Sequence, residues 1–134
     1  MKRIMALIAG LLFGAVAAIA APGQHKIAAT LDYDFTVDNA CSATVTTGCV
    51  KQFNIYDLTG AAPVLLFSIP SPPGATGPVT GITGTSPTLT LKAGSRTFGA
   101  TAQMADGTES SPNAATATAI IKPGAPVSFT VSMQ

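Results

Sequence analysis

Apolar and polar residues alternate along much of this chain, and the pattern is longest between residues 25 and 38. Every second position there is apolar: Ile27, Ala29, Leu31, Tyr33, Phe35 and Val37. Successive side chains of a strand point to opposite faces, so this segment predicts one long antiparallel strand with a core side and a solvent side. Asp32, Asp34 and Asp38 fall on the solvent side. Two aspartates on one face could hold a cation, but a solvated strand face is the favoured interpretation.

A second alternating stretch, RTFGATAQMADGTESS, covers residues 96–111. Its apolar positions share one predicted face and are Phe98, Ala100, Ala102 and Met104. Threonine and glutamine residues take the other face. The alternation stops at Asp106-Gly107, a dipeptide that is typical of tight hairpin turns. The stretch therefore predicts a half-buried strand followed by a turn.

Shorter apolar runs predict further strands at residues 50–58, 63–69, 88–91 and 115–122. Pro63 and Pro70 flank the second of these runs, which marks an edge strand because proline cannot donate a backbone hydrogen bond. Residues 70–87 are rich in Pro, Gly, Ser and Thr, and we expect a mobile loop there with one short strand near residues 79–83. No stretch after residue 21 has a helical period.

Together these segments predict an all-β fold: one domain over residues 22–134, built as an immunoglobulin-like antiparallel β-sandwich. Residues 123–134 are a candidate for an extra C-terminal strand. The predicted core consists of Leu31, Tyr33, Phe35, Phe53, Ile55, Leu89, Leu91, Phe98, Ala100 and Ala102.

The N-terminal segment, residues 1–21, has the three parts of a secretory signal. Lys2 and Arg3 precede an uncharged apolar run, and the run ends in small residues that suit cleavage after Ala20 or Ala21. We expect a signal helix that is removed on export, which predicts a secreted, periplasmic or cell-surface protein. An uncleaved membrane anchor is the alternative, because the run reaches the lower limit of what can span a bilayer.

Export would place the two cysteines, Cys41 and Cys49, in an oxidising compartment, where so close a pair predicts one disulfide. Closing this short loop would stabilise the fold by about 2.5 kcal/mol. A metal site would need further ligands, and the only histidine, His25, is remote in sequence.

Charge and motifs argue against several function classes. Charged residues make up 10% of the chain and the net charge is +1, so the basic patch expected of a nucleic-acid-binding protein is missing. The sequence has no G-x-S-x-G motif and no histidine pair, and we expect neither a cofactor nor enzymatic activity. A weak calcium site using Asp106 and Glu109 remains a minor alternative.

Four segments resemble a fibronectin type III domain of exported bacterial proteins. LDYDFT (31–36) resembles the B strand, with Tyr33 where a core Trp is usual, and QFNIYD (52–57) resembles the C strand. LKAGSRTF (91–98) resembles the entry to strand F, with Phe98 where a Tyr is usual, and MADGTESSPN (104–113) resembles the F–G connection. This resemblance implies a module for adhesion, spacing or recognition.

Three functions remain open from the sequence. The first is a secreted or cell-surface module that binds an extracellular protein. The second is a glycan-binding or other ligand-binding sandwich, for which Tyr56 is the clear aromatic candidate. The third is a self-associating fibre subunit in which the alternating segment 127–133, VSFTVSM, is donated to a neighbouring molecule. Pairing of that segment within its own sandwich is favoured over donation.

Overall fold

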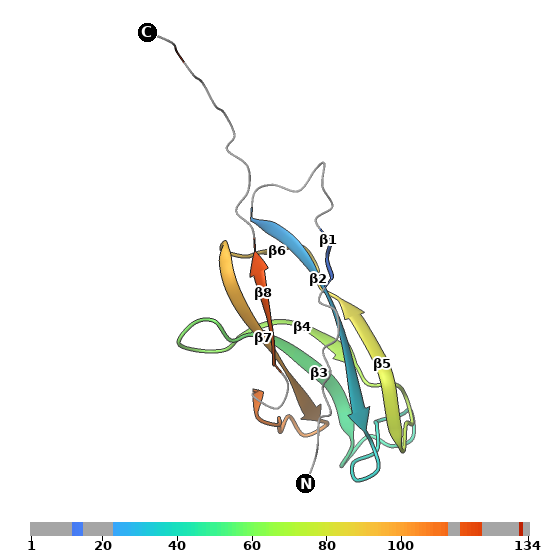
Figure 1. Ribbon diagram of the computed structural model, residues 1–134. Coiled ribbons are helices and arrows are strands. Elements are labelled where there is room, and N and C mark those ends of the chain that lie inside the picture. The colour runs from blue at the N-terminus through green and yellow to red at the C-terminus, as the bar shows by residue number, and fades with distance from the viewer. Residues whose placement is uncertain (1–11, 15–22, 113–115, 122–131, 133–134) are drawn as a thin grey trace.

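The computed structural model of the 134-residue chain describes residues 12–14, 23–112, 116–121 and 132 (Figure 1). One sheet contains β1 (Leu12–Gly14), β2 (Gln24–Asp34), β5 (Pro78–Thr85) and β6 (Leu89–Thr90). The other contains β3 (Val50–Asp57), β4 (Val64–Pro70), β7 (Gly94–Met104) and β8 (Thr116–Ile121). All strand pairs are antiparallel, and the described residues include no α-helix. The predicted all-β antiparallel sandwich is confirmed.

The order of the strands determines which edges of the two sheets meet. The first sheet runs β1-β2-β5, with β6 beside the beginning of β2, and the second runs β4-β3-β7-β8. The edge strands β4 and β5 contact each other across the sandwich. The β1 and β8 edges therefore lie on the opposite side.

The core lies between the sheets and is built mainly from β2, β3 and β7. Every predicted core residue is buried except Leu89, which is only partly buried beside Leu91 and Phe98. Three rings form the centre: Tyr33 lies 4.7 Å from Phe35 and 5.1 Å from Phe53 between centroids. The Tyr33 hydroxyl is buried and has no hydrogen-bond partner among the residues that the structure describes, so this residue acts in the core as a ring.

The strand β2 ends earlier than the alternation of residues 25–38 predicts. β2 ends at Asp34, and Val37, expected on the core side, is 69% exposed. The Asp34 carboxylate accepts a hydrogen bond of 2.9 Å from the backbone N–H of Thr36 and a second one from its hydroxyl. Such a local bond offers the backbone an alternative to the sheet ladder, so the chain turns away after Phe35.

The Pro- and Gly-rich residues 70–87 contain the short strand that we predict near residues 79–83, and this strand is longer than predicted: β5 covers eight of the residues and pairs with β2 along most of its length. Gly81 has a φ of 71° and donates its N–H to the Asp32 carboxylate at 2.9 Å, where the β2–β5 register shifts. A glycine therefore serves a bulge in this strand. Composition alone cannot show that β2 supplies a partner.

The expected signal helix lies largely outside the described residues. Its three described residues form β1 instead, and they pair with Lys26, Ile27 and Ala28 at the edge of β2. For Leu12–Gly14 the helical prediction is thus corrected, because β2 offers these residues a backbone partner. Whether residues 1–21 are cleaved stays a prediction.

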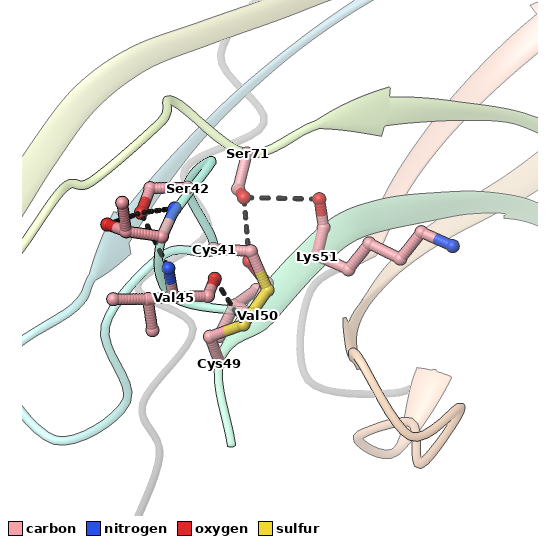
Figure 2. The surroundings of a disulfide bond; sticks show 8 residues. Cys41, Ser42, Val45, Cys49, Val50, Lys51 and Ser71 are labelled. Carbon is pink, nitrogen blue, oxygen red and sulfur yellow. Dashed lines mark hydrogen bonds between the residues drawn. A yellow bond between two sulfur atoms is a disulfide. The ribbon is translucent and has the colours of Figure 1, made fainter. Parts of the chain in front are cut away.

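One end of the sandwich is held by the Cys41–Cys49 disulfide, which confirms the predicted pairing (Figure 2). It fixes the segment around Ala40 along the beginning of β3, where the two segments form a parallel bridge from Ala40 to Val50. Ser71 joins the same end by donating its hydroxyl to the Val50 carbonyl at 2.7 Å. The disulfide and the Ser71 hydrogen bond together therefore join the segments around Ala40, Val50 and Ser71 at this end of the sandwich.

Removing the disulfide should weaken this end without changing the fold. We expect the double variant Cys41→Ser/Cys49→Ser to lose about 2–3 kcal/mol of unfolding free energy, because the unfolded chain gains freedom. Urea denaturation followed by circular dichroism measures the loss, and reduced wild-type protein should match the variant. An unchanged midpoint would show that the bond contributes no stability.

Gly84 should resist substitution because β4 approaches it closely. A Cβ atom at Gly84 would lie 2.5 Å from Cγ1 of Ile69, a buried and stiff β-branched side chain. We expect Gly84→Ala to cost about 1–3 kcal/mol in urea denaturation. Gly77→Ala is the control, since its Cβ would meet no atom within 4 Å. Equal effects of the two substitutions would contradict the close packing.

Candidate functional site

The outer side of the β4–β3–β7 sheet carries the largest group of connected polar side chains that the structure describes. Phe53 and Ile55 of β3 point into the core, so the residues that alternate with them point outward. The register places Asn54 beside Ser68 of β4 and Thr101 of β7, and Gln52 beside Gln103. We call this group the polar face; it consists of Gln52, Asn54, Tyr56, Ser68, Thr101, Gln103 and Glu109.

Amide groups connect the three strands of the polar face. Gln52 Nε2 donates to Asn54 Oδ1 at 2.8 Å and to Gln103 Oε1 at 2.9 Å. The Ser68 hydroxyl donates to Asn54 Oδ1 at 2.7 Å. These cross-strand bonds restrict the side chains to one arrangement.

Glu109 reaches the polar face from the chain that follows the Asp106-Gly107 turn. The predicted turn is present: Gly107 has a φ of 92°, and its N–H bonds the Met104 carbonyl at 3.0 Å. The chain then runs back along the end of β7, where Ser110 N–H donates to the Ala102 carbonyl at 3.0 Å. This pairing brings the Glu109 side chain to β7 and β3.

The Glu109 carboxylate collects hydrogen bonds from two strands. The Tyr56 hydroxyl lies 2.9 Å from both carboxylate oxygens, and the Thr101 hydroxyl donates at 3.1 Å. Asn54 Nδ2 donates to the same carboxylate. Asn54 and Thr101 are 3% and 1% exposed although they lie on the outer side of the sheet. Glu109 therefore closes the polar face at one end.

The pKa values of Glu109 and Tyr56 are shifted in opposite directions. Burial would raise the pKa of Glu109, but the bonds from Asn54, Tyr56 and Thr101 outweigh it and lower the pKa. Burial, together with the bond to Glu109 and its charge, raises the pKa of the Tyr56 hydroxyl. Near neutral pH the pair is thus an ionised acceptor and a protonated donor.

Leu65 adds an apolar neighbour to the polar face. It pairs with Tyr56 across β4 and β3, so both side chains project outward, and it is 52% exposed. The register of β4 shifts at this point, which leaves Leu66 between the paired residues Leu65 and Phe67. The register thus places an exposed leucine beside the partly buried tyrosine on the outer side of the sheet.

A buried ion pair lies at the end of β3. Asp57 is 5% exposed and accepts a hydrogen bond from Arg96 of β7, and the Thr59 N–H donates to it at 2.9 Å. Burial would raise the pKa of Asp57, but the bonds from Thr59 and Arg96 outweigh burial and lower it. Every polar contact of this carboxylate is structural, since it joins β3 to β7 and to the following turn.

Other residues that the sequence singles out are also held by local bonds. Asp106 accepts the Thr108 N–H at 2.9 Å, whereas Glu109 turns to the polar face, so these two carboxylates do not form the considered calcium site. Within the described ranges, no three His, Cys, Asp or Glu residues lie close enough to hold a metal ion. His25 lies within β2, opposite Leu89, rather than in a frayed end.

A recess in the surface lies beside the disulfide. It has a volume of about 250 Å³ and is lined by Cys41, Ser42, Thr46, Lys51 and Ala105. Figure 2 shows the Lys51 side chain extending away from the disulfide. A smaller hollow of about 70 Å³ lies beside Glu109, between Met104 and Ser110. The Ser42 hydroxyl in the larger hollow accepts the Val45 N–H at 3.0 Å, so it belongs to its own turn.

No protein family, curated protein or solved structure that we compared matches this chain. In the part of the chain that the structure describes, no helix is long and apolar enough to cross a membrane. The functional argument therefore depends on the residues of the polar face and on Leu65.

Glu109 should stabilise the fold through its hydrogen bonds as well as its charge. We expect Glu109→Gln to cost about 1 kcal/mol at pH 7, because a neutral amide is a weaker acceptor for three donors. Glu109→Asp keeps the charge but shortens the side chain, and it should cost a similar amount. Urea denaturation measures both variants. If Glu109→Asp were as stable as wild type, charge rather than reach would be the cause.

The same bonds predict a dependence on pH. The folded pKa of Glu109 is lowered, so its contribution is fully present above the unfolded value of about 4.3 and is lost as pH falls through the folded pKa. The stability difference between wild type and Glu109→Gln should therefore shrink below pH 4. A difference that stays constant down to pH 2 would contradict this assignment.

Proposed function

We propose that this chain is a non-enzymatic, exported β-sandwich module that binds an extracellular or cell-surface protein through the polar face and Leu65. The observation that carries the proposal is the adjacent pair of Tyr56 and Leu65 on an ordered sheet, surrounded by amide and hydroxyl groups. Tyrosine is enriched at protein interfaces, and polar groups commonly surround an apolar centre there.

The roles of the carboxylates favour binding over catalysis. Asp34 and Asp106 accept bonds from their own turns, Asp57 binds Arg96, and Glu109 binds the polar face. A catalytic base must be free to take a proton from a substrate. These groups are instead held by the fold, which supports a module that acts through its surface.

Two features support export. The positively charged start, the apolar run and the small residues of positions 1–21 are those of a signal segment. The disulfide fits an oxidising compartment. Fibronectin type III-like remains our family proposal; the ordered Asp106-Gly107 turn lies within the segment that resembles the F–G connection of that family.

A glycan is the second candidate partner, because Tyr56 places an aromatic ring with a polar hydroxyl on the outer side of the sheet. Sugars bind to aromatic rings that have polar groups nearby, whereas the exposed apolar Leu65 beside the Tyr56 ring suits a protein better. A glycan array with the purified domain distinguishes the two partners.

The test compares two substitutions that introduce the same charge at exposed positions. We expect Leu65→Asp to weaken binding of the fluorescent domain to intact cells of the source organism about tenfold. Val37→Asp is the control, because Val37 is exposed and follows β2 of the other sheet. Circular dichroism checks that both variants are folded. Equal binding by Leu65→Asp and wild type would contradict the proposed surface, and loss of binding after glycosidase treatment of the cells would favour the glycan.

A further inference from the structure

The two cysteines of the disulfide differ in their exposure to solvent. Cys41 is partly exposed and lines the recess of about 250 Å³, whereas Cys49 is fully buried and is not among the described residues that line it. A disulfide exchanges when a thiolate attacks one of its two sulfur atoms, and access is one of the factors that decide which sulfur is attacked. The fold therefore opens this disulfide to attack from the Cys41 side.

The size and charge of the recess suit a small thiol. Its volume of about 250 Å³ is below the range of about 300–1,000 Å³ that is usual for pockets of drug-sized ligands. Among the described residues that line it, Lys51 alone is charged, and its exposed side chain extends away from the disulfide (Figure 2). A positive charge here favours the approach of an anion, and the thiolate is the reactive form of a thiol.

Backbone hydrogen bonds hold both cysteines independently of the bond between their sulfur atoms. The Cys41 N–H donates to the Val50 carbonyl at 2.9 Å, and the Gly74 N–H donates to the Cys41 carbonyl at 3.2 Å. The Ala105 N–H donates to the Cys49 carbonyl at 2.9 Å. Opening of the disulfide therefore leaves the two cysteines side by side.

We propose that Cys41 is the site at which a low-molecular-weight thiol forms a mixed disulfide with this protein. The thiolate attacks Cys41 Sγ, a new S–S bond forms, and the bond to Cys49 breaks with its electron pair on Cys49 Sγ. Cys49 then takes a proton from water, and its thiol can donate to the Val45 carbonyl, which lies 3.4 Å from Cys49 Sγ (Figure 2). The small thiol is oxidised and the Cys49 sulfur is reduced, so no further reagent is needed.

The adduct is reversible because Cys49 stays beside Cys41. The Cys49 thiolate attacks Cys41 Sγ again, expels the small thiol and restores the original disulfide. This exchange site lies at the end of the sandwich and is separate from the polar face, so it does not depend on the partner that the polar face binds.

The experiment locates the adduct on the full oxidised chain. The protein reacts briefly with L-cysteine at mildly alkaline pH, acid stops the reaction, and N-ethylmaleimide then blocks the free thiols. Trypsin cleaves after Lys26 and Lys51 and leaves both cysteines in one peptide, in which fragment ions distinguish Cys41 from Cys49. The same reaction in concentrated urea is the control, because unfolding exposes both cysteines equally.

We expect about tenfold more L-cysteine on Cys41 than on Cys49 in the folded protein, and about equal amounts in urea. Equal labelling in the folded protein, or an excess on Cys49, overturns the proposal. So does a preference that persists in urea, since the local sequence rather than the fold would then cause it. Absence of any adduct on the folded protein also overturns it.

Single-cysteine variants give a second measurement of the same difference. Cys49→Ser leaves the thiol of Cys41, and Cys41→Ser leaves the thiol of Cys49; circular dichroism checks that both variants are folded. We expect the Cys41 thiol to react with dipyridyl disulfide about tenfold faster in the folded variants and at an equal rate in urea. Equal rates in the folded variants would contradict the assignment. If either variant does not fold, the adduct on the wild-type chain decides.

Discussion

The structure depends on the contact of three aromatic rings between its two sheets. Tyr33 and Phe35 come from the first sheet and its exit, Phe53 comes from the second, and the Phe35 and Phe53 centroids are 6.1 Å apart. Buried rings of this size contribute more apolar area than any other side chains, and tilted or edge contacts suit their quadrupoles. The chain has no Trp, so these rings share the centre that one larger side chain could fill. Small partners make room, since Phe53 pairs with Ala102 and Ile55 with Ala100.

Much of this core could be predicted from the sequence because period-2 alternation is a local property. Phe53, Phe98 and Leu31 are buried where the pattern places them. The pattern fails where a different local bond competes with the ladder, as at Asp34, which ends β2 before Val37. It indicates only residues 79–83 of β5, because the glycines there look like a loop until the bulge opposite Asp32 is known.

The candidate site was less predictable, for a reason that lies in the register. Glu109 is separated from Thr101 by 8 residues and from Tyr56 by 53, and only the pairing of β3 with β7 brings them together. The sequence correctly indicates the turn that precedes Glu109 and the outward direction of Tyr56. It gives no measure of how far the glutamate reaches after the turn, so the sequence alone leaves a calcium site with Asp106 as a minor alternative. Leu65 was missed because its run reads as uniformly apolar.

The close approach of β4 to β5 at Gly84 and Ile69 makes the two sides of the sandwich unequal. On that side a backbone position of β5 lies directly against a buried side chain of β4. Thermal motion that separates the sheets should therefore be smallest along β4 and β5, where Ile69 packs against Gly84.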